Sequence, residues 1–188
     1  MEEQTTSELD VLYRISQALL HLNDVSELVQ EVFEILNDQM GMQRGTLTLR
    51  RPQTDILVIE ASKGLTADEQ RRGQYQVGEG ITGRVAETGE PALIPDITHE
   101  PSFLDRTRSR GNVEMAFLCV PIIHQRDVIG TISIDRPSAP LLELENDLSF
   151  LKIVAHLLAE AVSNIHVQVE ERELLLEENR QLRLEVSG

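Results

Sequence analysis

The sequence predicts an α+β fold, in which a central antiparallel sheet of five or six strands carries several helices and is followed by a long helix. Two hairpin patterns predict the sheet: alternating residues at 45–61 around a PQTD turn, and apolar runs at 117–134 around a polar turn. The third observation is the segment from Leu144 onward, which has no glycine or proline before Gly188 and keeps a helical pattern. The chain of 188 residues suits one domain plus an extension.

Two amphipathic helices are expected before the first strand. Apolar residues recur every three or four positions from Ser7 to Leu22 and again from Val25 to Met40. Asn23 and Asp24 separate the two helices, and Gly41 ends the second.

The first hairpin pairs Gly45–Arg51 with Ile56–Ala61. A short helix follows at Thr66–Arg72, because Thr66 can cap its start and Glu69 stands three residues later. Four glycines then surround a short amphipathic stretch, Ile81–Thr88, ahead of a strand at Pro91–Pro95; they are Gly78, Gly80, Gly83 and Gly89. Glycine is needed where backbone must adopt positive φ or approach another group closely, so this segment indicates a lid over a pocket.

A helix of some 40 residues is longer than one small sheet can cover, so its far half must protrude. The apolar positions of that half follow a heptad spacing with one break at Arg172, and Asn179 falls at a core position. This pattern predicts a coiled-coil homodimer, with a lone solvated helix as the alternative. We therefore expect a domain at 1–160 and a coiled-coil linker at 161–188.

Composition excludes several classes of function. The formal net charge of −15 argues against direct nucleic-acid binding, which needs clustered Lys and Arg. The acidic N-terminus is unlike a signal peptide, and no apolar run approaches the roughly 18 residues of a membrane span. A single cysteine, Cys119, forbids an internal disulfide, and the chain is expected to be cytoplasmic and not membrane-bound.

No catalytic or metal motif stands out. The five histidines show no metal-ligand spacing, and there is no GxSxG nucleophile motif. GEGITG lacks the Lys-Ser/Thr of a nucleotide-binding P-loop. Cys119 lies in an apolar strand, where a buried inert thiol is the expected state and a redox role is the alternative. The sequence therefore predicts a protein without enzymatic activity.

Charged residues gather in the lid region instead. The set comprises Arg84, Asp96, Arg106, Arg108, Arg110, Asp135 and Arg136. Arginine is suited to bidentate capture of a carboxylate or phosphate, so the loop that carries three of these arginines could close over an anionic ligand. A solvated loop is the alternative, and the two aspartates could anchor that loop.

The strings GEGITGRVAETGEP, LIPD, VPI and IGTISIDR together resemble the GAF domain. RGTLTL, EPSFLDRT and FLCVPI further resemble the N-terminal domain of NifA-type activators of nitrogen fixation. The resemblance covers roughly Leu9–Leu158. It implies a sheet with the terminal helices on one face and a ligand pocket on the other.

The resemblance also implies partners. It implies 2-oxoglutarate or a PII-type signalling protein as effector, and a sigma-54-dependent AAA+ ATPase downstream, for which this sequence has no Walker A lysine motif. A docking or dimerisation module without a small ligand, and a cyclic-nucleotide-binding GAF domain, are the alternatives; an iron site involving Asp96, Cys119 and Asp135 is a further one. The candidate ligand-binding residues are Arg84, Asp96, Arg106, Arg108, Phe117, Cys119 and Asp135, with no metal ligand and no certain cofactor.

Overall fold

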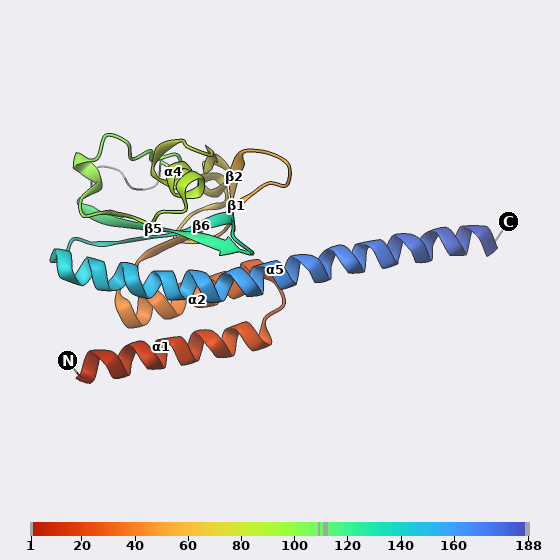
Figure 1. Cartoon of the computed structure of the whole chain (residues 1–188), viewed down its shortest axis with the longest axis horizontal. Coiled ribbons are helices and arrows are strands. Elements are labelled where there is room, and N and C mark those ends of the chain that lie inside the picture. The colour runs from red at the N-terminus through yellow and green to blue at the C-terminus, as the bar shows by residue number, and fades with distance from the viewer. Residues whose placement is uncertain (1, 109, 111–112, 187–188) are drawn as a thin grey trace.

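The computed structural model describes residues 2–108, 110 and 113–186, which form three layers (Figure 1). The middle layer is a six-stranded sheet with strand order β3-β2-β1-β6-β5-β4, in which each neighbouring pair is antiparallel. The strands are β1 Arg44–Arg50, β2 Ile56–Lys63, β3 Gln74–Gln76, β4 Ala92–Ile94, β5 Met115–His124 and β6 Asp127–Pro137. The predicted antiparallel α+β fold is confirmed. The sequence did not identify β3, which is only three residues long and has one buried residue, Tyr75.

Two helices cover one face of the sheet, α2 Val25–Met40 and α5 Leu141–Val186, and α1 Glu2–His21 packs against these two helices on the side away from the sheet (Figure 1). The other face carries α3 Ala67–Arg72, α4 Gly80–Thr88 and a short 3-10 turn, η1, at Ile97–His99. Gly41 adopts φ +66° and ends α2 as expected. Thr66 and Glu69 form the capping box that starts α3. The first helix begins at Glu2, five residues before the predicted start.

The two faces of the sheet have different chemistry. In β1, Leu47 and Leu49 belong to the large apolar core shared with the helices. Thr46 and Thr48, which alternate with them, line the opposite side under α4. The helix side of the sheet is therefore an apolar core, whereas the lid side carries buried hydroxyl groups.

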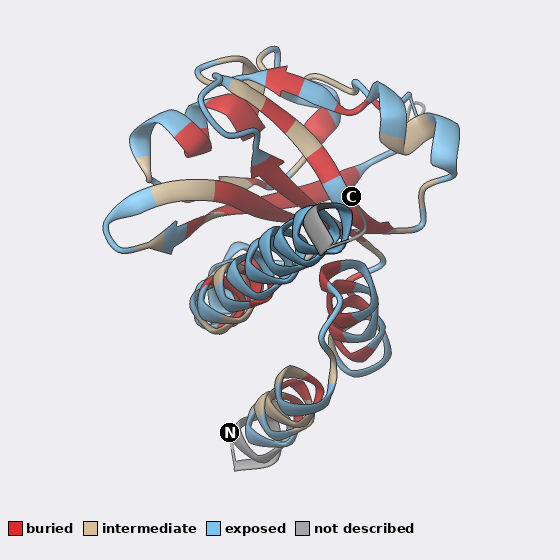
Figure 2. Cartoon of the chain, turned by 90° about the vertical axis from the view of Figure 1, so that its right-hand side faces the viewer, coloured by how far each residue is buried: buried red, intermediate tan, exposed pale blue. Residues whose placement is uncertain are grey.

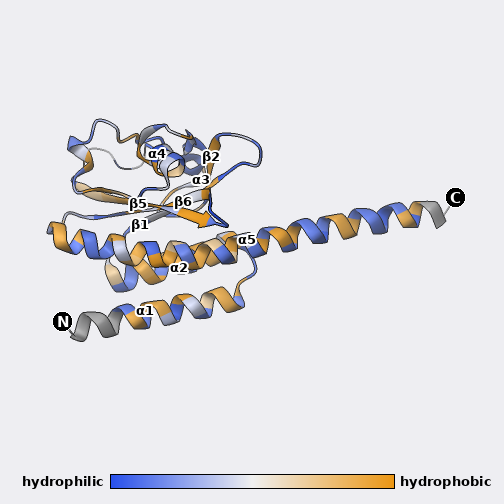
Figure 3. Ribbon diagram, in the orientation of Figure 1, coloured by the Kyte–Doolittle hydropathy of each residue, from blue (hydrophilic) through white to orange (hydrophobic). Residues whose placement is uncertain are grey.

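Helix α5 spans 46 residues and changes character along its length. Leu151, Val154 and Leu158 are fully buried against the sheet, and Ile165 is the last buried side chain among those that the structure describes. The part of α5 that extends toward the C-terminus is exposed (Figure 2). By length and composition alone, one apolar stretch of α5 could cross a membrane; the buried side chains just named account for its apolar character. From residue 166 to 184 the helix is exposed, and apolar and charged residues are interspersed along it (Figure 3).

Gly83 lets the lid helix approach the chain before it, because a Cβ at this position would overlap the Gln76 carbonyl oxygen. We expect Gly83→Ala to lower the free energy of unfolding by about 2–3 kcal/mol, the usual cost of overpacking. Gly41→Ala is the matched control, since its Cβ would meet nothing within 4 Å; its positive φ should cost only about 1 kcal/mol. Denaturant unfolding measures both, and equal losses would contradict the close approach.

Candidate functional site

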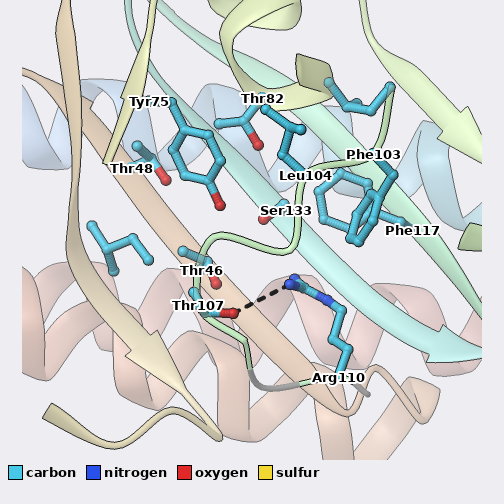
Figure 4. A pocket seen from close by; sticks show the side chains of 12 residues that line it. Thr46, Thr48, Tyr75, Thr82, Phe103, Leu104, Thr107, Arg110, Phe117 and Ser133 are labelled. Carbon is cyan, nitrogen blue, oxygen red and sulfur yellow. Dashed lines mark hydrogen bonds between the residues drawn. The ribbon is translucent and has the colours of Figure 1, made fainter. Parts of the chain in front are cut away.

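A cavity lies between the sheet and the lid, on the side opposite the long helices (Figure 4). The lining side chains are mostly hydroxyl-bearing or aromatic: Thr46, Thr48, Ile59, Tyr75, Ile81, Thr82, Phe103, Leu104, Thr107, Arg110, Phe117 and Ser133. The open volume is only about 10 Å³ for the centre of a water-sized sphere. That volume is about one water molecule, so the lid is closed in this state.

Hydroxyl groups form the floor of the cavity. Thr48 of β1 and Ser133 of β6 are 1% and 6% exposed, and Thr82 approaches from α4 on the opposite side. Burial raises the pKa of the Tyr75 hydroxyl to about 12, so this group stays neutral at physiological pH. The floor therefore offers neutral hydrogen-bond donors and acceptors.

The loop over the cavity packs closely against the start of α4. Gly80, the first residue of α4, has φ +64°, and a Cβ there would collide with the Leu104 side chain of the following loop. Arg72 donates to the Thr107 carbonyl oxygen at 2.7 and 3.2 Å, and Arg106 pairs with Glu79 just before α4. The loop is thus held to both α3 and the start of α4.

Arg110 reaches the cavity from this loop and is the charged side chain among the described residues that line it. Its Nε donates to Asp135 Oδ2 at 2.7 Å and its Nη2 donates to Asp135 Oδ1 at 3.1 Å, a bidentate pair. Its Nη1 donates to Asp105 Oδ1 at 3.1 Å and to Thr107 Oγ1 at 3.4 Å. The side chains of Arg110 and Asp135 are only 8% and 2% exposed. Burial raises the pKa of Asp135, and pairing with the Arg110 guanidinium opposes that rise.

Two aromatic rings complete the surroundings of this cation. The Arg110 guanidinium carbon lies 5.1 Å from the centre of the Phe103 ring and 5.6 Å from that of Phe117. The two rings meet edge to face, with centroids 5.1 Å apart. Arg110 is therefore enclosed by carboxylates and aromatic faces together.

The predicted site residues divide into two groups. Phe117 lines the cavity, Asp135 bonds the Arg110 side chain that lines it, and Cys119 is fully buried two residues beyond Phe117 on β5. Burial raises the pKa of the Cys119 thiol to about 12, which leaves little reactive thiolate at neutral pH.

The other predicted residues lie outside the cavity. Arg84 is exposed on α4, and Arg106 and Arg108 line an open hollow of about 540 Å³ together with Arg72. Asp96 caps η1: it accepts the Thr98 N–H at 2.9 Å and bonds His99 Nδ1 at 2.6 Å. As ligand contacts, all seven residues remain predictions.

Sequence reasoning missed the hydroxyl floor, and its ligand candidates from the loop are Arg106 and Arg108, whereas the structure buries Arg110 at the cavity. Arg110 was in the wider lid set but not among the ligand candidates, because spacing alone could not tell it from Arg106 and Arg108. The alternation of threonine with leucine in β1 was a usable signal for Thr48. Within the described part of the chain, no cluster of three His, Cys, Asp or Glu side chains could hold a metal ion.

A sheet with helices packed on one face and a lidded cavity on the other is the architecture expected from the sequence strings. The family model of the GAF domain matches residues 24–162. The chain therefore belongs to the GAF domain family. The solved A. aeolicus nlh2 GAF domain, in an inactive state, superposes with a TM-score of 0.75 at 25% identity, covering 85% of this chain and 97% of that one.

Proteins related in sequence show which kind of GAF-containing protein the chain is similar to. The chain is 38% identical to the nitrogen fixation protein VnfA of Azotobacter vinelandii, over 96% of this chain and 35% of the relative. It is 32% identical to the Nif-specific regulatory protein of Herbaspirillum seropedicae, over 96% of this chain and 34% of the relative. The resemblance to NifA-type regulators is confirmed, and the chain spans about a third of the length of these relatives.

Removing the Arg110 side chain should destabilise the domain strongly. Arg110→Ala leaves the Asp135 carboxylate buried without its bidentate partner, a change that usually costs about 3–5 kcal/mol. Arg84→Ala is the control, since an exposed arginine on the same lid should change the free energy of unfolding by no more than about 0.5 kcal/mol. Denaturant unfolding of both variants tests the pair, and a loss below about 1 kcal/mol for Arg110→Ala would contradict its importance.

Proposed function

We propose that this chain is the sensory domain of a Nif-type, sigma-54-dependent transcription activator. In this proposal the state of the lid passes along α5 to an AAA+ domain of the full-length, cytoplasmic protein. One observation carries the proposal: consecutive residues of β6, Asp135 and Arg136, tie the lid and the long helix to the same strand.

The two side chains leave β6 in opposite directions, as neighbours on a strand do. Asp135 holds Arg110 in the lid. Arg136 pairs with Asp147 near the start of α5, and its Nη2 donates to Glu143 Oε1 at 3.3 Å. If this end of β6 shifts when the lid moves, the Arg136 contacts would therefore displace the first turns of α5.

A small metabolite is the effector that we favour, with 2-oxoglutarate as the first candidate. Arg72, Arg106 and Arg108 surround the outer hollow, where a dicarboxylate could engage guanidinium groups. Ligand binding that draws the loop outward would break or rearrange the Arg110 contacts. The domain would then change between closed and open lid states.

The nearly filled cavity favours a second candidate function. A space of about 10 Å³ is far smaller than the pockets of roughly 300–1,000 Å³ that hold most small ligands. In the closed state the domain could act as a docking surface for a PII-type regulator and bind no small molecule.

Titration with 2-oxoglutarate, with cyclic nucleotides as comparison ligands, tests the proposed function. We expect saturable heat that weakens about tenfold or more in Arg106→Ala or Arg108→Ala, since each change removes a charge-assisted hydrogen bond. Hydrogen exchange should change in the loop and in the first turns of α5 on binding. Arg136→Ala should keep the affinity and lose the change in α5.

Arg51→Ala is the matched control, because Arg51 is exposed immediately after the last residue of β1. It should behave as the unmodified chain in both measurements. Binding that leaves α5 unchanged would contradict transmission along β6. Absence of heat with every small ligand would favour the docking function, with a PII-type protein as the next titrant.

We further propose that the chain is a homodimer through its N- and C-terminal helices. Leu9, Tyr13 and Leu20 are exposed on α1, all above 60%. Leu175 and Leu182 are exposed on the protruding half of α5. A second copy would cover both sets, with Asn179 favouring a parallel two-stranded register.

The heptad break at Arg172 gives a direct test of this dimer. Arg172→Leu should lower the dimer dissociation constant, because it places an apolar side chain in the proposed seam. Leu182→Asp should raise that constant by burying a charge. Sedimentation of both variants measures the change, and two unchanged constants would rule out this seam.

A further inference from the structure

Arg110 occupies a built cation site. The Asp135 carboxylate receives the guanidinium through two parallel bonds, and Asp105 accepts from the remaining terminal nitrogen. Phe103 and Phe117 present ring surfaces within 6 Å of the guanidinium carbon. Carboxylates and aromatic faces arranged around one centre are the groups that recognise guanidinium and ammonium ions.

The charge balance of this site favours cations over anions. Arg110 is the only charged residue among the described residues that line the cavity. It faces two carboxylates, Asp105 and Asp135, and both are already bonded to it. Arg44 of β1 also favours the charged form of Asp135, so the carboxylates are balanced while Arg110 is in place. An incoming cation could take over the contacts that Arg110 now makes, whereas an incoming anion would face these two carboxylates.

The cation and the fixed half of its site come from different elements. Asp135 and Phe117 are on the central strands β6 and β5, whereas Arg110 belongs to the connection between η1 and β5. The Arg110 side chain can therefore leave while the sheet stays intact. Its departure would open space over Thr48 and Ser133, whose hydroxyl groups could contact the body of a ligand.

We propose that the cavity binds a small molecule with a guanidinium or primary amine head, and that the Arg110 side chain is a tethered competitor for this site. The inference rests on the proposed sensory function and assigns the ligand class of the inner cavity. Because a tethered group competes at a high effective concentration, the unmodified chain binds such a ligand weakly.

Removing the Arg110 side chain should strengthen binding of the cationic ligand. No such gain in affinity would follow if the role of Arg110 were purely structural. We expect Arg110→Ala to bind agmatine at least tenfold more tightly than the unmodified chain in calorimetric titration. Methylguanidinium at 10 mM should raise the lowered melting temperature of Arg110→Ala by at least about 2 °C. Methylurea, its neutral isostere, should not.

Two variants control the experiment. Adding Asp135→Asn to Arg110→Ala should abolish both effects, because it removes the carboxylate that receives the cation. Arg51→Ala, an exposed arginine away from the cavity, should match the unmodified chain with every probe. If Arg110→Ala does not fold, the unmodified chain decides: saturable agmatine binding lost in Asp135→Asn supports the site, and no saturable binding at 50 mM overturns it.

The outcomes separate this inference from the sensory function. A folded Arg110→Ala that neither cation stabilises or binds overturns the cation site. Saturable binding of 2-oxoglutarate by the same protein would leave the sensory function standing. Conversely, cation binding and rescue without any change in hydrogen exchange of α5 would support the site and count against transmission to the long helix.

Discussion

Adjacent residues of a strand face opposite sides of the sheet, and the organisation of this domain depends on that constraint. In β6, Ile132 and Ile134 pack into the core beneath the helices, while Ser133 and Asp135 face the lid. One strand therefore contributes to the apolar core and to the polar cavity at once. Because Arg136 follows Asp135 and reaches α5, the same constraint places the lid contact and the helix contact on successive residues.

The buried pair of Arg110 and Asp135 is better understood as a switchable contact than as a source of stability. Taking both charges out of water costs nearly as much as their attraction returns, and apolar replacements of such pairs are often neutral or stabilising. A pair that only held the lid could be replaced by apolar packing. A pair in which another cation can replace Arg110 at Asp135 is suited to a domain that changes between two states.

Helix α5 joins two environments in one element. Its first half is part of the core, where Val154 and Leu158 are fully buried, and its second half is exposed beyond Ile165. Since a continuous helix transmits rotation or translation along its axis, a small displacement at Asp147 would be carried into the exposed half. The exposed leucines in this half provide a surface on which a second chain could pack, so that the displacement would reach that chain as well.

The sequence by itself determined the secondary structure, the antiparallel sheet and the resemblance to the GAF family, because these depend on local periodicity, capping residues and glycine positions. It also placed Asp135 at the end of an apolar strand. Only the tertiary structure decided which loop arginine is buried: Arg106, Arg108 and Arg110 have equal spacing, but Arg110 alone reaches Asp135 across 25 residues of chain. The short strand β3 and the hydroxyl floor likewise depend on strand pairing between distant segments, which local pattern does not encode.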